Sequence, residues 1–280
     1  MSKLKIAGVV ILYEPSDEDL SNMNTYIDDV DLLYVIDNSK EKNDSRLIKS
    51  KKIKYIFNNE NKGLSIPYND ACELARKDGY KWLLTMDQDT RFEKNVLNVL
   101  KDKIEHTDTS DIGIVVAWHN TKLHVPKPKE DVDYPLDVMS SGNLVNLDIH
   151  KKLGGFKDWL FIDGIDIEYG LNLRKHGFKI MRVNTVEMIH NLGDLYYKKV
   201  LNKEILVTNH SALRRYYMVR NYLYIRDMYI DIEPEFCKIL VKFKTLVFAI
   251  VFYENNKLQK LKAMRRGYKD YKHNVRGKRV

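Results

Sequence analysis

The chain has 280 residues, of which 44% are hydrophobic and 31% charged, and this composition excludes a disordered or collagen-like protein. The length fits one large domain, or one domain with an appendage. Two cysteines are too few for a disulfide framework or a cysteine zinc site, so we expect a reducing, cytoplasmic compartment.

The formal net charge of +8 is concentrated near the C-terminus. Residues 257–280 contain ten Lys and Arg against one acidic residue, Asp270, so the rest of the chain is nearly neutral. A protein that binds nucleic acid over its whole body would spread its charge, so we expect no nucleic-acid partner. The N-terminal residues lack a small-residue cleavage site, and no uncharged apolar run reaches the ~18–20 residues of a spanning helix, so we expect neither a signal peptide nor a membrane span.

Strands and helices alternate in the first half of the sequence. Apolar runs, typical of strands buried on both faces, lie at 5–12, 31–37, 53–57, 81–86 and 112–118. Segments that favour helices lie at 16–28, 65–77 and 93–105. This order predicts an α/β fold with a mostly parallel sheet flanked by helices, in which ligands bind beyond the carboxyl ends of the strands.

The second half is less regular. Prolines and charges predict a loop over 119–137, short strands are predicted at 178–183 and 185–189, and the pattern is helical from about residue 211 to the end. We therefore expect an α/β domain over 1–210, with halves at 1–118 and 119–210, followed by a helical appendage over 211–280.

Asp87, Gln88 and Asp89 stand at the end of an apolar strand. Two carboxylates one residue apart can turn toward one ligand where a strand gives way to a loop, and oxygen ligands suit Mg²⁺ or Mn²⁺. The alternative is a solvated turn with two surface acids.

A second acidic group, Asp163, Asp166 and Glu168, lies near a predicted helix N-terminus. There the helix dipole stabilises carboxylates by ~0.3–1 kcal/mol, which is the purely structural explanation. The functional explanation is a general base that takes a proton from a hydroxyl nucleophile. His190, at the end of a predicted strand, is either structural or a metal ligand facing Asp89.

In chain order, these motifs resemble inverting glycosyltransferases of family 2 with the GT-A fold, and most closely the bacterial rhamnosyltransferase-like group that builds surface polysaccharides. The resemblance runs from about residue 5 to 225. It rests on segments 10–13, 37–39, 61–64 with Asn69, 87–89, 141–143, 154–156, 161–169, His190 with Gly193, and 214–221. The chain departs from the family pattern at Glu14-Pro15 and at Ile165-Asp166, where more widespread members have Glu-Asp.

The resemblance implies a role for each motif. Asp166 aligns with the catalytic base, and Asp89 with His190, supported by Asp87, aligns with ligands of Mg²⁺ or Mn²⁺. The residues implied on the donor side are Tyr13, Asp37, Asn38, Asn61, Gly63, Asn69, Asp87 and Gln88. Those implied on the acceptor side are Gly142, Asn143, Asp163 and Glu168.

By this resemblance, residues 1–118 are the nucleotide-sugar half and 119–210 the acceptor half of a catalytic GT-A domain. The Asp-Gln-Asp motif favours dTDP-rhamnose as donor, with a UDP-hexose or UDP-galactofuranose as the alternative. A nucleotidyltransferase would need a basic, Gly-rich phosphate loop after the first strand, and the acidic segment 13–17 lacks one. A more distant alternative is a non-catalytic protein that binds nucleic acid through its basic tail.

Residues 239–253 are strongly apolar and interrupted by Lys242 and Lys244, and the basic segment follows them. This order favours a helix lying in the interface of an anionic membrane. With the saccharide acceptors of this group, which are usually linked to polyprenyl lipid, it predicts a cytoplasmic protein peripheral to the inner face of the plasma membrane. The alternatives are a helix packed on the catalytic domain and a homodimer contact.

Overall fold

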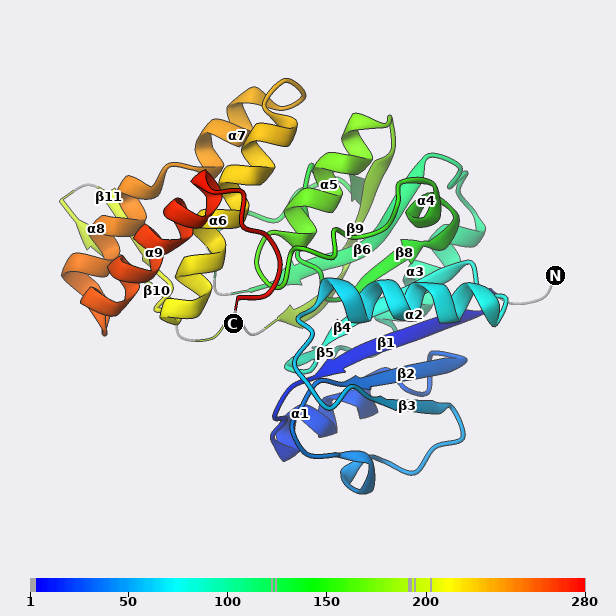
Figure 1. The fold of residues 1–280 in the computed structure, drawn as a ribbon. Helices are drawn as coiled ribbons and strands as arrows, with labels where there is room; N and C mark the ends of the chain where they lie inside the picture. The colour runs from blue at the N-terminus through cyan, green and yellow to red at the C-terminus, as the bar shows by residue number, and fades with distance from the viewer. Residues whose placement is uncertain are drawn as a thin grey trace. The chain divides into compact units, whose positions relative to one another are not determined.

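The computed structural model describes residues 4–121, 123, 125–190, 193, 195–201 and 203–279, without the side chains of His190 and Lys203. The chain divides into two compact units (Figure 1). Unit 1 comprises residues 1–158 and 165–191, and unit 2 comprises residues 159–164 and 192–280. Segment 159–164 therefore leaves unit 1 and joins the C-terminal part of the chain.

Unit 1 confirms the predicted α/β class. Its strands are β1 (Ile6–Leu12), β2 (Leu32–Asp37), β3 (Ile53–Phe57), β4 (Trp82–Asp87), β5 (Thr90–Phe92), β6 (Ile112–Asn120), β7 (Val132–Asp133), β8 (Asn143–Asn146) and β9 (Lys179–His190). Its helices are α1 (Asp17–Asn22), α2 (Ser65–Lys77), α3 (Val96–Glu105), α4 (Leu147–Lys152) and α5 (Ile165–Lys175), with short 3-10 turns η1 (Met23–Thr25) and η2 (Asp44–Arg46).

Two predicted segments differ from the structure. The helix expected over 16–28 ends at Asn22 and continues only as the turn η1, and the two strands expected over 178–189 are one strand, β9. Strand β9 bends rather than breaks, because its pairing with β6 shifts register between Ala117 and Trp118.

The strand order is β3-β2-β1-β4-β8-β6-β9-β5, with β7 added on β9. The part expected to be parallel is parallel, since β3, β2, β1 and β4 all run in one direction. Strand β8 then enters antiparallel between β4 and β6, and β5 and β7 pair antiparallel with β9. Over the described residues the sheet is therefore mixed rather than mostly parallel.

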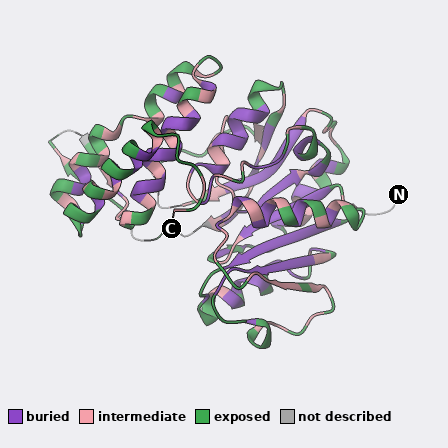
Figure 2. Cartoon of the chain, viewed as in Figure 1, coloured by how far each residue is buried: buried purple, intermediate pink, exposed green. Residues whose placement is uncertain are grey.

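Every residue of β1 is buried, as expected of a strand covered on both faces. Figure 2 shows the same burial along the central strands of unit 1. One side of the sheet packs Val10, Leu33 and Leu84 into a core with Leu97 and Leu100 of α3. This core fixes β1 and its neighbours, and thereby the positions of their carboxyl ends.

Unit 2 is a β-hairpin followed by helices. Its elements are β10 (Tyr196–Val200), β11 (Lys203–Val207), α6 (Ala212–Tyr229), α7 (Pro234–Leu240), α8 (Phe243–Tyr253) and α9 (Lys257–Lys272). Val219 and Leu223 of α6 form its core with Ile250 of α8 and Met264 of α9. Across the described ranges, none of the helices has both the length and the apolar character needed to cross a bilayer.

The helical appendage expected from residue 211 is present, but unit 2 is larger than that prediction. It includes the unpredicted antiparallel hairpin β10–β11 and segment 159–164. Asn221 of α6 holds this segment by donating both hydrogens of its side-chain amide, to the carbonyl oxygens of Ile162 at 2.9 Å and Asp163 at 2.8 Å.

Candidate active site

The carboxyl ends of β2 and β4 bring two predicted acids to one edge of the sheet. In the strand register, Leu12 of β1 is paired with Asp37 of β2, and Ile11 of β1 is paired with Asp87 of β4. Asp37 and Asp87 therefore flank the end of β1, two strand spacings or roughly 10 Å apart. Tyr13 is the first residue after β1, the strand that lies between β2 and β4 in the sheet.

Asp87 is held from two sides. Its backbone N–H donates to the hydroxyl of Ser141 at 2.9 Å, and its Oδ1 accepts a hydrogen bond from the hydroxyl of Tyr68 at 3.0 Å. Burial raises the pKa of Tyr68 well above its ordinary value, and the charges of Asp87 and, more weakly, Asp166 raise it further. The proposed base and the strand-end acid thus act on one hydroxyl group, although they are far apart in the sequence.

Asp166 lies in the first turn of α5 and is partly exposed. Its Oδ1 accepts a hydrogen bond from the backbone N–H of Ile167 at 2.9 Å, an interaction typical of a carboxylate at a helix N-terminus. The helix dipole and a role in proton transfer are compatible at this position, because the side chain is only partly buried.

The β5–β9 ladder brings the backbone at two of the predicted metal ligands, Asp89 and His190, close together. Asp89 is exposed in the turn after β4, and the next residue, Thr90, pairs with His190 at the end of β9. The backbone therefore brings the chain at His190 beside the Asp89–Thr90 turn. The side chain of His190 lies outside the described part of the structure.

The donor set here fits a hard divalent ion in part. Asp87 and Asp89 supply carboxylate oxygens two residues apart at a strand end, which are the ligands that Mg²⁺ and Mn²⁺ prefer. Within the described side chains, which do not include that of His190, no group of three or more His, Cys, Asp or Glu is placed to hold a metal ion.

Asp37 organises the loop that follows β2. Its Oδ1 accepts from the backbone N–H of Ser39, and its Oδ2 accepts from the backbone and side-chain amides of Asn43 and from the hydroxyl of Tyr55 at 2.6 Å. Burial alone would raise the pKa of Asp37, but these hydrogen bonds together lower it below its ordinary value. The carboxylate is therefore charged and fully buried, and its hydrogen bonds fix the conformation of residues 38–43.

Three of the predicted donor-side residues form one hydrogen-bond network. The side-chain amide of Asn38 donates to the carbonyl of Gly63 at 2.8 Å and accepts from the side chain of Asn58 at 2.8 Å. The backbone N–H of Gly63 in turn donates to Oδ1 of Asn61 at 2.9 Å. The ends of β2 and β3 and the loop before α2 are thereby tied together beside Asp37.

Tyr13 and Gln88, both predicted on the donor side, are also hydrogen-bonded to each other. The backbone N–H of Tyr13 donates to Oε1 of Gln88 at 2.8 Å, which joins the end of β1 to the turn after β4. The ring of Tyr13 is 48% exposed, so it can still stack on or contact a ligand at this edge.

Asn69 lies apart from this network. Its Oδ1 accepts from the backbone N–H of Phe156 at 2.9 Å and contacts Nε2 of His150 at 3.1 Å, while its amide donates to Oδ1 of Asp158 at 2.6 Å. Its hydrogen-bonding groups are therefore used to hold segment 150–158. The structure does not bring it together with Asn38 and Asn61.

Two of the residues predicted on the acceptor side, Gly142 and Asn143, lie in unit 1 near β4. Gly142 has a φ of +79°, and a Cβ there would overlap Met188, so only glycine fits. Asn143 is buried in β8, opposite Thr85 of β4. Both follow Ser141 directly in the chain, and the hydroxyl of Ser141 accepts the hydrogen bond from the backbone N–H of Asp87.

The other two are buried carboxylates. Glu168 of α5 is fully buried, with Nζ of Lys157 at 4.0 Å. Asp163 belongs to unit 2, where its side chain accepts from Nε and Nη2 of Arg214 at 3.0 and 2.5 Å. Burial raises the pKa of Asp163 despite this guanidinium. Both carboxylates are closed to solvent, with side chains that are 0% and 3% exposed.

Sequence reasoning missed Tyr68 and gave no separate role to Ser141. Tyr68 follows Pro67 in the first turns of α2, and an aromatic residue there reads as ordinary core. Only the fold shows that its hydroxyl meets Asp87. The tyrosine hydroxyl itself was the one indication in the sequence, because a buried tyrosine hydroxyl usually has a hydrogen-bond partner.

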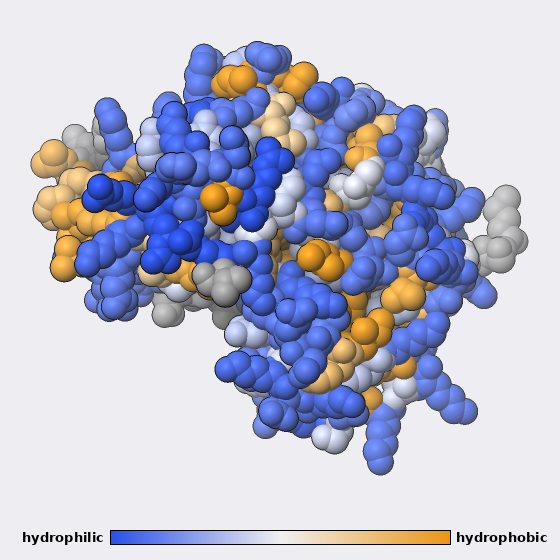
Figure 3. Space-filling model, viewed as in Figure 1, coloured by the Kyte–Doolittle hydropathy of each residue, from blue (hydrophilic) through white to orange (hydrophobic). Residues whose placement is uncertain are grey.

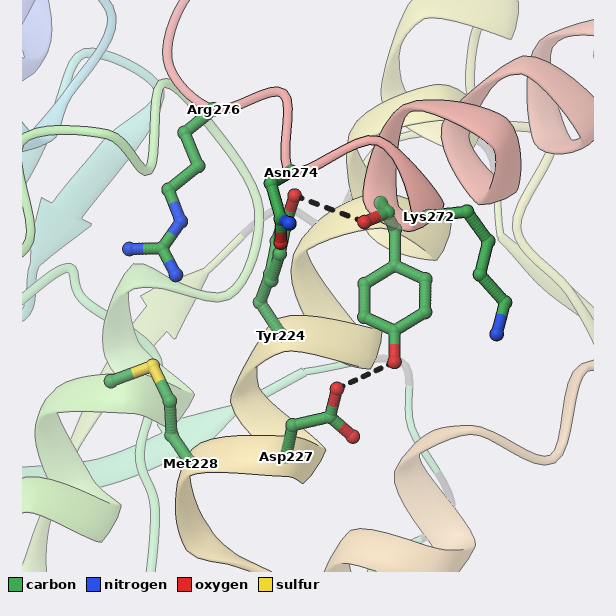
Figure 4. A pocket seen from close by; sticks show the side chains of 7 residues that line it. Tyr224, Asp227, Met228, Lys272, Asn274 and Arg276 are labelled. Carbon is green, nitrogen blue, oxygen red and sulfur yellow. Dashed lines mark hydrogen bonds between the residues drawn. The ribbon is translucent and has the colours of Figure 1, made fainter.

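Unit 2 contains a pocket of about 290 Å³, lined by Tyr224, Asp227, Met228, Tyr271, Lys272, Asn274 and Arg276 (Figure 4). Asp227 accepts from the hydroxyl of Tyr271 at 2.5 Å and from Nη2 of Arg226 at 2.6 Å. A smaller pocket of about 130 Å³ lies in unit 1 beside Tyr134 and Phe178. Neither of these pockets includes a residue predicted for the active site.

Comparison with known proteins identifies the family. A model of glycosyl transferase family 2 matches residues 19–162, which is more than half of the chain. The protein named dTDP-rhamnosyl transferase RfbF from Shigella flexneri is 23% identical over 268 residues, which cover 88% of this chain and 86% of that protein.

Solved structures of glycosyltransferases share the fold. Residues 1–349 of S. aureus TarS, in complex with UDP-GlcNAc, align with a TM-score of 0.59 at 14% identity, over 97% of this chain and 82% of that one. GalNAc-T7 with UDP, GalNAc and Mn²⁺ aligns with a TM-score of 0.58 at 12% identity, and this chain, 98% covered, spans 57% of its length. The GT-A fold is confirmed, and the chain is a member of glycosyl transferase family 2.

Proposed function

We propose that the chain transfers a sugar, with inversion at the anomeric carbon, from a nucleoside-diphosphate sugar to a hydroxyl group of a saccharide acceptor. The observation that carries this proposal is the hydrogen bond from the hydroxyl of Tyr68 to Oδ1 of Asp87 at 3.0 Å, with the charge of Asp166 also raising the pKa of that hydroxyl, in a chain of glycosyl transferase family 2. It supports a single site in which a strand-end acid and a proton acceptor lie within reach of one substrate.

The loops after β1, β2 and β3 would bind the nucleotide. Asn38, Asn61 and Gly63 form a connected, partly buried network there, and Asp37 fixes the loop beside them. A rigid loop of this kind lowers the entropy lost when a ligand binds. The exposed ring of Tyr13 at the same edge would cover the base or ribose.

Asp166 would act as the general base. Its carboxylate takes the proton of the acceptor hydroxyl while the hydroxyl oxygen forms a bond to the anomeric carbon. The bond from that carbon to the diphosphate oxygen breaks on the opposite face, and the nucleoside diphosphate leaves. A positioned base of this kind contributes typically ~10²–10⁴-fold to the rate.

Asp89 and His190, with Asp87, would hold Mg²⁺ or Mn²⁺. When bound, such an ion neutralises the negative charge of the leaving diphosphate. Asp87 is already oriented by Tyr68 and Ser141, and such hydrogen bonds position a ligand before the ion arrives.

L-Rhamnose carried by dTDP is the proposed donor, supported by the name of the S. flexneri relative. A UDP-sugar is the second candidate, supported by the nucleotides in the titles of the TarS and GalNAc-T7 structures. We propose a polyprenyl-linked saccharide as acceptor, in the synthesis of a bacterial surface polysaccharide. The reaction would then take place in the cytoplasm, at the inner face of the plasma membrane.

A thermal-shift panel of dTDP-, UDP- and GDP-sugars, each with and without Mn²⁺, tests the proposal. A ligand at 100 times its dissociation constant stabilises the folded protein by ~2.7 kcal/mol, so the true donor should raise Tm clearly above the others. We expect dTDP-rhamnose to give the largest shift and Mn²⁺ to increase it. A panel in which no nucleotide sugar shifts Tm would contradict the proposed function.

A further inference from the structure

Helix α8 is apolar around nearly its whole circumference, yet one face is open to solvent. Its sequence, FKTLVFAIVFY, contains a single charged residue, Lys244. Val247, Val251 and Phe252 on the outer face are 36%, 37% and 59% exposed, and the ring of Phe248 lies 4.6 Å from that of Phe252. A helix with apolar residues all round is normally covered on all sides.

The other face of α8 already has its partners. Ile250 is fully buried against Val219 and Leu223 of α6 and Met264 of α9, and Leu246 packs on the same cluster. The exposed apolar face is therefore left over after unit 2 has formed its own core.

Helix α9 carries the complementary feature. Lys262, Arg265, Lys269 and Lys272 are all exposed and recur every three or four residues, so they form one cationic stripe. The acids nearest in sequence are buried in ion pairs: Glu254 with Arg215 and Lys260, and Asp270 with Arg279. These acids do not neutralise the stripe.

Helices α8 and α9 lie against each other in unit 2. Figure 3 shows apolar surface over α8 at the left edge of the view, beside strongly hydrophilic surface over α9. Leu258, in the first turn of α9, is 74% exposed and adds a further apolar side chain to the surface of these two helices.

We propose that the outer faces of α8 and α9 form a docking surface for an anionic lipid bilayer. Val247, Val251 and Phe252 would enter the boundary between headgroups and acyl chains, and the cationic stripe would lie on the phosphates around them. This pairing of apolar and basic faces is what an interfacial helix requires. Such a surface would bring the proposed transferase to a lipid-linked acceptor. The inference depends on the proposed function in this one respect.

Charge decides against the other occupants. A second copy of the chain docked through the same surface would bring two cationic stripes together, because an isologous contact repeats each patch. Nucleic acid would use the stripe but would leave the apolar face of α8 exposed, since its phosphates make no use of apolar side chains. Only a surface with both negative charge and an apolar interior matches both faces.

Sedimentation of the full chain with phosphatidylcholine vesicles, with and without phosphatidylglycerol, tests the proposal. We expect binding only when phosphatidylglycerol is present, and weaker binding at higher salt. Replacement of three stripe residues, Lys262→Gln, Arg265→Gln and Lys269→Gln, should lower the partition coefficient about 100-fold. Val251→Ser with Phe252→Ser should lower it roughly tenfold or more.

The matched control removes the same charge from exposed lysines of unit 1, by Lys49→Gln, Lys51→Gln and Lys77→Gln. It should bind vesicles as the wild type does. If it weakens binding as much as the stripe variant, or if the apolar variant binds normally, the proposed surface is wrong. A wild-type dimer that the apolar variant dissociates, without vesicle binding, would assign the face to a second copy. Oligonucleotide binding through the stripe, without vesicle binding, would assign it to nucleic acid.

Two further variants distinguish a loss of membrane binding from a loss of folding and from a loss of catalysis. Phe252→Trp places a fluorophore on the face without removing its apolar character, and its emission should shift to the blue with anionic vesicles alone. Asp166→Asn should bind vesicles like the wild type, so a failed transferase assay and failed membrane binding are distinguishable.

Discussion

The hydroxyl of Tyr68 donates a hydrogen bond to Oδ1 of Asp87 at 3.0 Å, and the charge of Asp166 acts on the same hydroxyl. This links a side chain of α2 with the carboxyl end of β4 and the first turn of α5. Tyr68 therefore donates to one of the two acids that we propose as functional, and the charge of the other raises the pKa of the same hydroxyl.

Tyr68→Phe should impair catalysis while leaving the fold intact. The variant removes one hydrogen bond to a charged group, which is worth ~1.5–3 kcal/mol, so kcat/KM should fall roughly 10- to 100-fold. Asp87 is half-buried, and water can replace the lost donor enough to keep the protein folded. Steady-state transfer kinetics and a thermal melt measure the two effects.

Tyr26→Phe is the matched control. The ring of Tyr26 is buried, its pKa is raised by burial and by the charge of Asp87, and its hydroxyl makes no hydrogen bond with any described residue. Loss of this hydroxyl should leave kcat/KM unchanged. Equal losses in both variants would mean that Asp87 is perturbed through its general surroundings rather than through Tyr68.

Asp89→Asn should remove the effect of Mn²⁺ on donor binding. If Asp89 ligates the ion, the extra rise in Tm that Mn²⁺ gives in the presence of donor should disappear, because a neutral amide is a poor ligand for a hard cation. Asp28→Asn, at an exposed acid of the same unit, should keep the full Mn²⁺ effect. A normal Mn²⁺ effect in the Asp89 variant would rule out Asp89 as a ligand.

Asn221→Ala should destabilise unit 2. It leaves the partly buried carbonyls of Ile162 and Asp163 without their side-chain donor, and an unsatisfied group of this kind costs ~1–3 kcal/mol when it is buried. We expect a loss of about 2–4 kcal/mol in the free energy of unfolding, measured by urea denaturation. Asn255→Ala, at an exposed position of the same unit, should change it by less than ~0.5 kcal/mol.

Burial of His150 should make unit 1 sensitive to acid. Burial, with a smaller effect of Arg76, lowers the pKa of His150 from 6.5 to about 4, so the unfolded chain binds a proton that the folded chain excludes. The resulting stability is complete above pH 6.5 and is lost as pH falls toward 4. The loss amounts to roughly 3 kcal/mol over this window.

His150→Gln should flatten the fall in unfolding free energy between pH 6.5 and 4, because glutamine binds no proton there. His176→Gln, at an exposed histidine just after the end of α5, should leave the pH dependence unchanged. A His150 variant with the slope of the wild type would show that the acid sensitivity arises elsewhere.

The strand ends of unit 1 could be predicted from the sequence for a physical reason. Strands β1, β2 and β4 are buried on both faces, so their residues read as unbroken apolar runs that end at the acids. Parallel strands share an edge, and this placed Asp37 and Asp87 together without coordinates. The identity of the proton acceptor came from the resemblance, since helix position alone explains a carboxylate at Asp166.

The sequence did not predict the hairpin β10–β11. Both strands mix lysines with apolar residues, so the period of two that marks a half-buried strand is weak. The sequence also did not predict the burial of Arg215, Arg220 and Glu254, because charged side chains are rarely buried and only the fold supplies their partners.

We expected the basic segment 257–280 to be a cationic tail. Its last residues instead pack on aromatic side chains of unit 2. Arg276 stacks 5.1 Å from the ring of Trp159 and 5.0 Å from that of Tyr224, and Lys278 lies 5.9 Å from the ring of Phe161. These contacts join aromatic residues of segment 159–164 to the end of the chain, and no periodicity in the sequence could indicate them.

The turnover and donor affinity of Asp166→Asn test the central claim most directly. With the donor that gives the largest thermal shift, we predict an unchanged dissociation constant and a loss of roughly 10²–10⁴-fold in turnover. Asp148→Asn, at the acid in the first turn of α4, controls for the helix dipole and should keep full turnover. Near wild-type turnover in Asp166→Asn, with donor bound normally, would contradict the account.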